Sequence, residues 1–306
     1  DSTSYAFGID DRGLVRHLYW GKKIQSPDEL ELPELTEVST NDPVFEITPE
    51  EFPVHGGLRY KEHCLKAVFA DGTRELVYQY CGYDVEQNDG WEELVLHLRD
   101  GHYEFFMDLH YKLYPQYDLM ERSVVLNNQS ADPIQIEQIH SAQFHNPYFI
   151  LDRDATETQG DVYFGALRLS GNFSGVVEQT PYGETLVQMG LNPHDCLLEL
   201  APGESFTAPA ILCGYSDSGF ETMSHNLHRF ALDHIMSKGL RPVLYNSWEA
   251  TEFHVTSRDQ IKLAQKAAEL GAELFVLDDG WFGERHSTQN GLGDWYVNEG
   301  KFPNGL

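Results

Sequence analysis

The sequence has little basic charge and no long apolar run. It contains 21 lysines and arginines against 49 aspartates and glutamates, a formal net charge of −28 at pH 7. Proteins that hold a nucleic-acid backbone or an anionic membrane surface need clustered Lys and Arg, so the charge argues against both partners. No apolar stretch reaches the roughly 18 residues typical of a membrane-spanning helix. These features predict a soluble, globular protein that handles a neutral substrate.

Cysteines are few, and the potential metal ligands are scattered. Cys64, Cys81, Cys196 and Cys213 lie far apart with no CxxC spacing, so they indicate no zinc or redox site. Two alternatives stay open for them, buried reduced thiols or two disulfides. The 14 histidines show no HxxxH or HExxH spacing, and no glycine-rich phosphate loop follows a strand. The sequence therefore indicates no metal and no other cofactor.

The chain lacks an initiator methionine and the basic and apolar regions of a signal peptide. We therefore expect that its true N-terminus was removed or is not included. The compartment, cytoplasmic or secreted, stays open on this evidence.

Residues 1–216 have the pattern of many short strands. Strands are expected at 119–126, 162–170, 184–191 and 208–215, with Asn, Gly and Pro between them. The clearest strand has an apolar residue at every second position, the period of a strand with one buried face: Tyr103, Phe105, Met107, Leu109, Tyr111 and Leu113. With no helical period in this region, the pattern predicts a β-sandwich domain over residues 1–216.

The pattern changes after residue 216. Apolar residues at helical spacing predict a helix at 220–235 inside a linker at 217–240. A short apolar strand is expected at 241–245, a helix at 257–270 and a buried strand at 274–277. The helix is expected to have its N-cap at Thr256 or Ser257 and to stop at Gly271. Ile261, Ala264 and Ala268 line one face of this helix, and its inner face is expected to be exposed if the unit is the start of a truncated barrel. Strand, helix and strand predict a βαβ unit within residues 241–306.

Carboxylates and indoles follow both predicted parallel strands. Residues 246–250 (Asn-Ser-Trp-Glu-Ala) come after the first, and residues 278–281 (Asp-Asp-Gly-Trp) after the second. In α/β barrels the functional residues lie at the carboxyl ends of the strands. Aromatic rings stack on the C–H face of a sugar while carboxylates accept its hydroxyls. The alternative interpretation makes Asp278 and Asp279 a turn with a helix cap and Trp248 a core residue.

Several long motifs resemble one enzyme family. They are residues 244–251 (Leu-Tyr-Asn-Ser-Trp-Glu-Ala-Thr), 276–283 (Val-Leu-Asp-Asp-Gly-Trp-Phe-Gly) and 292–298 with 302–306 (Leu-Gly-Asp-Trp-Tyr-Val-Asn and Phe-Pro-Asn-Gly-Leu). In this order they resemble the α-galactosidases of glycoside hydrolase family 36. Residues 52–61, 145–147 and 170–173 resemble the sandwich domain of that family, so the resemblance covers essentially the whole chain.

The resemblance implies an N-terminal β-supersandwich, a (β/α)8 TIM barrel and a small C-terminal β-domain. The implied activity is removal of terminal α-galactose from melibiose- and raffinose-type oligosaccharides. By position, Asp278 and Asp279 match the pair that binds galactose hydroxyls, and Trp248 matches a tryptophan at the edge of that pocket. Arg59 lies in a loop that reaches the active site of a neighbouring subunit in a tetramer, although some members have Asp there. The stretch near residues 141–147 looks shorter than the family pattern.

The resemblance also implies a retaining mechanism with two aspartates, a nucleophile and an acid/base. Both are expected on later barrel strands, beyond Leu306. Adjacent residues such as Asp278 and Asp279 cannot flank both faces of a sugar ring. We therefore expect a truncated barrel and a chain that is inactive by itself. Two alternatives stay open, a non-catalytic carbohydrate-binding or assembly module and a related α-N-acetylgalactosaminidase.

Overall fold

A computed structural model describes most of the chain, which divides into two compact units. The described residues are 2–27, 30–32, 49–57, 61–142, 148–180, 183, 185–194, 196–237 and 239–306. The units are Asp1–Met236 and Ser237–Leu306. Arg59 and the short stretch near residue 145 lie outside the described residues.

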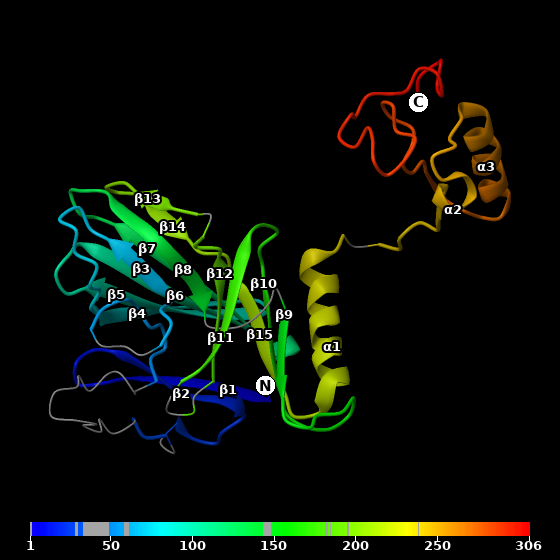
Figure 1. Cartoon of the computed structure of the whole chain (residues 1–306). Coiled ribbons are helices and arrows are strands. Elements are labelled where there is room, and N and C mark those ends of the chain that lie inside the picture. The colour runs from blue at the N-terminus through cyan, green and yellow to red at the C-terminus, as the bar shows by residue number, and fades with distance from the viewer. Residues whose placement is uncertain are drawn as a thin grey trace. The chain divides into compact units, whose positions relative to one another are not determined.

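Antiparallel sheets make up the first unit (Figure 1). Within the described residues, the largest sheet has the order β4-β5-β6-β7-β15-β10-β9, and β14 pairs with β7. The second has the order β11-β12-β8-β13, and β3 pairs with β8. Strands β1 and β2 form a separate two-stranded sheet. The bounds are β1 Thr3–Ile9, β2 Val15–Lys22, β3 Leu65–Val68, β4 Tyr78–Asn88, β5 Trp91–Asp100, β6 Phe105–Tyr114, β7 Leu119–Asn128, β8 Ile134–Ala142, β9 Tyr148–Asp152, β10 Val162–Leu167, β11 Phe173–Gln179, β12 Thr185–Leu191, β13 Leu198–Leu200, β14 Ser205–Thr207 and β15 Ile211–Ser216.

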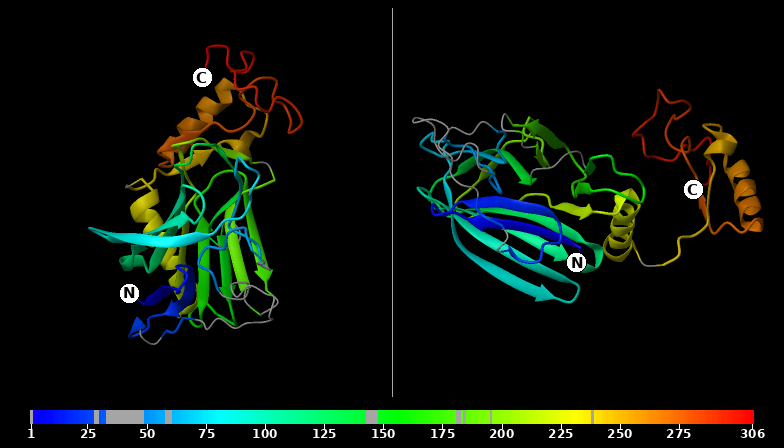
Figure 2. Two further views of the ribbon diagram at one scale, coloured as in Figure 1. Left: turned by 90° about the vertical axis from the view of Figure 1, so that its left-hand side faces the viewer. Right: turned by 90° about the horizontal axis from the view of Figure 1, so that it is seen from below.

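The two larger sheets share one hydrophobic core, and further views show their layers (Figure 2). Strand β6 contributes Phe105, Met107, Leu109 and Tyr111, which are all buried. Met107 and Leu109 pack in the same cluster as residues of β3, β8 and β12. The predicted sandwich and the alternating strand are therefore confirmed. Leu113 is 41% exposed. The row of buried side chains therefore ends at Tyr111, and the expected burial of Leu113 is wrong.

A helix follows strand β15 in the first unit. Helix α1 (Gly219–Phe230) continues into a π-helical turn, Ala231–Ile235. Met223 and Phe230 are buried, and the ring of Phe230 lies 4.9 Å from that of Tyr114 and 5.7 Å from that of Tyr117. The helix therefore covers part of the large sheet with its apolar face, as expected of an amphipathic helix.

The second unit contains a βαβ element. Strands β16 (Leu244–Asn246) and β17 (Leu274–Val276) are parallel, with Leu244 opposite Leu274 and Asn246 opposite Val276. Between them lie the short helix α2 (Trp248–Thr251) and helix α3 (Ser257–Glu269). Thr256 Oγ1 accepts a hydrogen bond from the N–H of Asp259, and Gly271 has a φ of +91°. The predicted cap and stop are confirmed, although strand β16 starts three residues later than expected.

The apolar face of helix α3 is largely exposed, as predicted. Ile261 is 57% exposed and Ala268 is also exposed, whereas Gln260 and Ala267 are the buried residues of the helix. The Gln260 amide donates to Thr251 Oγ1 over 3.1 Å. The buried face of the helix therefore includes a polar contact that apolar periodicity does not predict.

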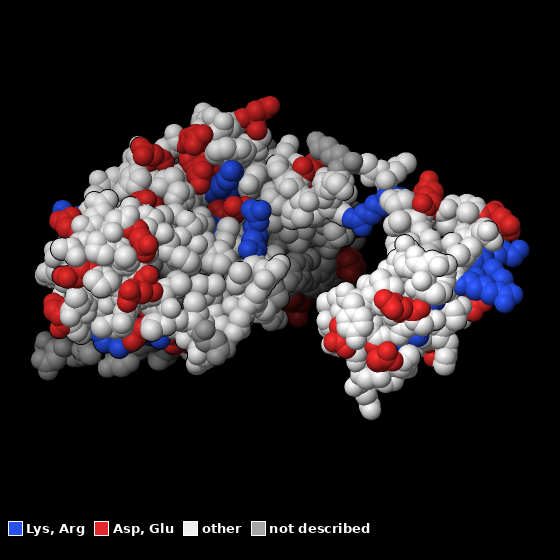
Figure 3. Space-filling model, turned by 90° about the horizontal axis from the view of Figure 1, so that it is seen from above, with Lys and Arg blue, Asp and Glu red and all other residues white. Residues whose placement is uncertain are grey.

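The four cysteines are free thiols, and Cys64 and Cys213 are buried. Burial raises the pKa of the Cys64 thiol, so this thiol stays protonated. Within the described residues, no helix has the length and hydropathy needed to cross a membrane. On the face drawn in Figure 3, Asp and Glu are widely spread, while Lys and Arg occur in small groups. That face has no broad basic surface.

A buried ion pair lies between the β1–β2 sheet and the large sheet of the first unit. Arg122 on β7 lies 2.7 Å from the carboxylate of Glu51, with their side chains 6% and 1% exposed. Tyr5 on β1 and Tyr111 on β6 donate their hydroxyls to the same carboxylate oxygen over 2.5 and 2.9 Å. His17 Nδ1 on β2 lies 3.0 Å from the other oxygen. Glu51 therefore ties the β1–β2 sheet to the large sheet.

Burial by itself would raise the pKa of Glu51, but Arg122, His17 and Tyr5 outweigh it and lower that pKa. A carboxylate with a lowered folded-state pKa stabilises the fold above its unfolded-state pKa, about 4.3 for Glu. That stabilisation is lost as the pH falls through the folded-state pKa. The join between the sheets is therefore weakened by acid.

We expect Glu51→Gln to lower the free energy of unfolding at pH 7 by about 3–5 kcal/mol, because it leaves Arg122 buried without a counter-charge. The variant should also lose part of the acid dependence below about pH 4.3. Urea unfolding at several pH values measures both effects.

Glu137→Gln is the matched control. Its pair with Arg74 is exposed, with side chains 34% and 46% accessible, so its loss should cost at most about 1 kcal/mol. Equal losses in the two variants would contradict the importance of the buried pair.

Candidate functional site

The carboxyl ends of β16 and β17 bring the predicted site residues together. The N–H of Ser247 donates to the Val276 carbonyl over 3.1 Å, and the N–H of Asp278 donates to Ser247 Oγ over 3.2 Å. The two strand ends are thus directly hydrogen-bonded. The prediction that Trp248 and Asp278 lie at the same end of the strand pair is confirmed.

Asn246 connects both residues. Its Nδ2 donates to Asp278 Oδ2 over 2.5 Å, and its Oδ1 accepts the N–H of Trp248 over 2.8 Å. Trp248 is half-buried, and its ring meets that of Phe253 edge-on at 5.0 Å. One amide side chain therefore fixes the carboxylate and the start of the helix that carries the indole. Asn246 was expected in the loop after a strand ending at residue 245, whereas it is the last residue of β16.

Asp279 is held by an arginine. Arg285 Nε lies 2.9 and 3.0 Å from the two carboxylate oxygens, and its Nη2 lies 2.8 Å from Oδ2. The Gly280 N–H donates to Oδ1 over 2.7 Å. Hydrogen bonds from Arg285 lower the pKa of Asp279, against the opposing effect of burial. Asp279 is therefore ionised and fixed in direction.

Arg285 is itself anchored. Its side chain is 6% exposed, its Nη1 donates to the Asn290 carbonyl over 2.8 Å, and its guanidinium lies 5.2 Å from the centre of the Phe253 ring. Lys301 donates to the carbonyls of Gly280 and Arg285 over 2.6 and 3.1 Å. Sequence reasoning missed both cations, because their partners are backbone carbonyls and a carboxylate that only the folded loop brings near.

The two aspartates differ in the acceptor capacity that remains. A carboxylate has about four lone-pair sites. Asp279 receives three contacts from Arg285 and one from Gly280. Asp278 receives only two among the described residues, from Asn246 and from the Asp279 N–H. Asp278 therefore has more capacity for an external hydroxyl. The described residues contain no cluster of three potential metal ligands.

Family models match both units. The glycosyl hydrolase family 36 N-terminal domain matches residues 13–147 and 143–201, and the melibiase model matches residues 205–306. The two segments of the first match meet where the sequence looks shortened. These matches define a glycoside hydrolase. The chain belongs to the α-galactosidases of glycoside hydrolase family 36 and corresponds to their N-terminal region.

Several curated relatives and solved structures that resemble this chain are α-galactosidases as well. Probable α-galactosidase G of Aspergillus terreus is 30% identical over 99% of this chain and 51% of its own length, and α-galactosidase Mel36A of Lactobacillus acidophilus is 30% identical with the same coverage. The crystal structure of α-galactosidase AgaA from Geobacillus stearothermophilus aligns with a TM-score of 0.90 and 27% identity, over 100% of this chain and 52% of that one. Variants of AgaA have been crystallised with raffinose and with stachyose. The chain spans about half the length of the curated relatives it matches.

We expect Arg285→Gln to raise the pKa of Asp279 toward about 3.9, the ordinary value for Asp, because the hydrogen-bonded positive charge is lost. Carboxyl-carbon NMR titration of Asp279 measures the change. Glu284→Gln alters the exposed neighbour of Arg285 and should leave the titration of Asp279 as it is. An unchanged titration in Arg285→Gln would mean that the ion pair does not form in solution.

Proposed function

We propose that this chain is the sandwich domain and the start of the catalytic barrel of a retaining α-galactosidase that acts on terminal α-galactosides of the melibiose and raffinose type. The observation that carries the proposal is the hydrogen-bonded group of Asp278, Asn246 and Trp248 at the carboxyl ends of two parallel strands. Active sites of barrel enzymes lie at that end. AgaA, a relative in sequence and fold, is crystallised with raffinose, which supports the same substrate class.

In this proposal the residues have distinct roles. Asp278 accepts hydroxyl hydrogen bonds from the galactosyl ring with its remaining lone pairs. Asp279, fixed by Arg285, supplies negative charge and a second, more restricted acceptor. Trp248 forms an edge of the pocket against the C–H face of the sugar. A contact from Arg59 of a neighbouring subunit in a homotetramer remains part of the proposal.

We further propose that the domains are residues 1–216, a linker at 217–240 and the barrel start at 241–306. The nucleophile and the acid/base then belong to later barrel strands. A sugar held at Asp278 needs one carboxyl group on each side of its anomeric carbon, about 5–5.5 Å apart. Asp278 and Asp279 are adjacent and differently oriented, and Asp279 is occupied by Arg285, so they do not form such a pair.

In a protein that includes this chain and a complete barrel, Asp278→Asn should lower kcat/KM for raffinose by roughly 10- to 150-fold. The reason is the loss of a charge-assisted hydrogen bond, about 1.5–3 kcal/mol. Steady-state kinetics measures it.

Glu273→Gln is the matched control, because this carboxylate accepts from the Val243 N–H at the opposite end of the same strands. It should leave kcat/KM nearly unchanged. Equal effects of the two substitutions would favour the alternative interpretation, in which Asp278 only shapes a turn.

The 306-residue chain by itself should release no aryl leaving group from an aryl α-galactoside, because the proposal assigns the nucleophile and the acid/base to later barrel strands. A continuous spectrophotometric assay on the purified chain measures this. Turnover near a typical enzyme value, about 10 per second, would refute the assignment of the catalytic pair to later strands.

A further inference from the structure

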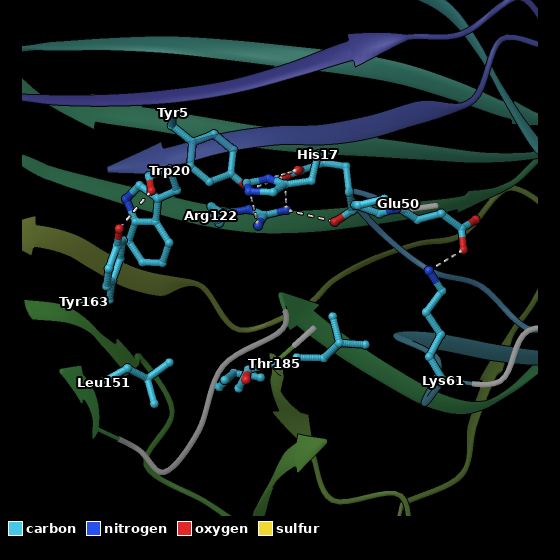
Figure 4. A pocket seen from close by; sticks show the side chains of 13 residues that line it. Tyr5, His17, Trp20, Glu50, Lys61, Arg122, Leu151, Tyr163 and Thr185 are labelled. Carbon is cyan, nitrogen blue, oxygen red and sulfur yellow. Dashed lines mark hydrogen bonds and ion pairs between the residues drawn. The ribbon is translucent and has the colours of Figure 1, made fainter. Parts of the chain in front are cut away.

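A pocket of about 300 Å³ lies inside the first unit, beside the buried ion pair (Figure 4). Strands β1, β2, β7, β9, β10 and β12 and the loop after residue 48 all contribute to its lining. Small-molecule sites have volumes of about 300–1,000 Å³. The pocket is therefore at the lower end of that range and suits a ligand of one sugar ring in size. It belongs to a different unit from the site at the ends of β16 and β17.

His17 offers an oriented hydrogen-bonding group in this pocket. Its Nδ1 lies 3.0 Å from the buried Glu51 carboxylate, which fixes a proton on that nitrogen. Among the described residues, its Nε2 has no hydrogen-bond partner, and the side chain is 33% exposed. An imidazole whose one proton is on Nδ1 directs Nε2, an acceptor nitrogen, away from Glu51. Glu51 is itself held in place by Tyr5 and Arg122.

The charges of the pocket cancel. Arg122 is paired with Glu51 at 2.7 Å, and Lys61 is paired with Glu50 at 3.4 Å, with side chains 3% and 7% exposed. Two cations therefore face two anions within the lining. An anionic or cationic ligand would bring a further charge into the pocket without a counter-charge, which is costly. The lining favours an uncharged ligand.

Aromatic rings form one side of the pocket. Figure 4 shows Trp20 and Tyr163 on one side and Glu50 and Lys61 on the other. The rings of Trp20 and Tyr163 meet edge-on at 5.1 Å, and the Tyr163 hydroxyl donates to the Trp20 carbonyl over 3.2 Å. These contacts hold both rings in place. Fixed aromatic surface opposite polar groups matches a molecule with C–H faces and hydroxyl edges.

We propose that this pocket binds a neutral, polyhydroxylated molecule of monosaccharide size. Its hydroxyls hydrogen-bond to His17 Nε2 and to the paired charges, and its C–H face lies against Trp20 and Tyr163. The proposal does not depend on the function proposed for Asp278, because it concerns separate residues in a separate unit.

Isothermal titration calorimetry on the 306-residue chain tests it, with galactose and glucose as neutral probes. Galacturonate and galactosamine are their charged counterparts, and the measurements are made at pH 7, where the carboxyl group of the first is ionised and most of the amine of the second is protonated. The Asp278→Asn substitution is present throughout, so that the site at the strand ends does not contribute the signal. We expect one saturable neutral-sugar site per chain and weaker binding of both charged sugars. His17→Ala should weaken binding at least about tenfold, the loss of one hydrogen bond.

Two further variants keep the result interpretable. Thr185→Trp places a large ring at the exposed residue that borders the pocket and should abolish binding without lowering the thermal unfolding temperature. His110→Ala removes another histidine held by a carboxylate, 3.0 Å from Glu93 and 25% exposed, outside the pocket, and should leave binding unchanged. The proposal would be overturned if neither neutral sugar showed saturable binding. It would also be overturned if Thr185→Trp bound a neutral sugar with unchanged affinity, or if a charged sugar bound more tightly than the neutral ones.

Discussion

The buried ion pair between Glu51 and Arg122 is the interaction on which the first unit depends. A charge with side-chain exposure of 1% is tolerable only when its lone pairs are occupied. Tyr5, Tyr111 and His17 occupy them from three strands. The two-stranded sheet is consequently attached to the large sheet by polar groups as well as by apolar packing. The same network leaves the pocket beside it lined with oriented, charge-balanced groups.

The second unit uses polar groups in a comparable way at its strand ends. Parallel strands place their carboxyl ends at one edge, and the side chains there would repel one another without donors between them. Asn246 links Asp278 to the indole segment, and Arg285 forms an ion pair with Asp279. Residues that touch no sugar in the proposed function thereby set the direction of those that do. Asp278 and Asp279 are the same residue type, but their hydrogen-bond partners leave them with different capacities to accept a hydrogen bond.

Membership of the family 36 α-galactosidases and the fold of its N-terminal region rest on independent agreement of sequence motifs, family models and structural alignment. The chain spans about half the length of the curated relatives it matches, and its activity, substrate and oligomer are therefore proposals. Two carbohydrate sites are proposed for different reasons. One rests on the strand-end position of carboxylates, and the other on charge balance around an internal pocket.

The sequence by itself determined the class of fold and the location of the strand-end residues. Alternation in β6, the cap at Thr256 and the stop at Gly271 are local, because they depend on residues two to four positions apart. The long motifs also indicated the family to which the chain belongs. Tertiary structure alone decided that the polar residue Gln260 is buried on helix α3, where its amide donates to Thr251. It also decided that Arg285 holds Asp279 and that Glu51 meets Arg122, 71 positions away, because pairings of buried charges across strands leave no periodic signal in the chain.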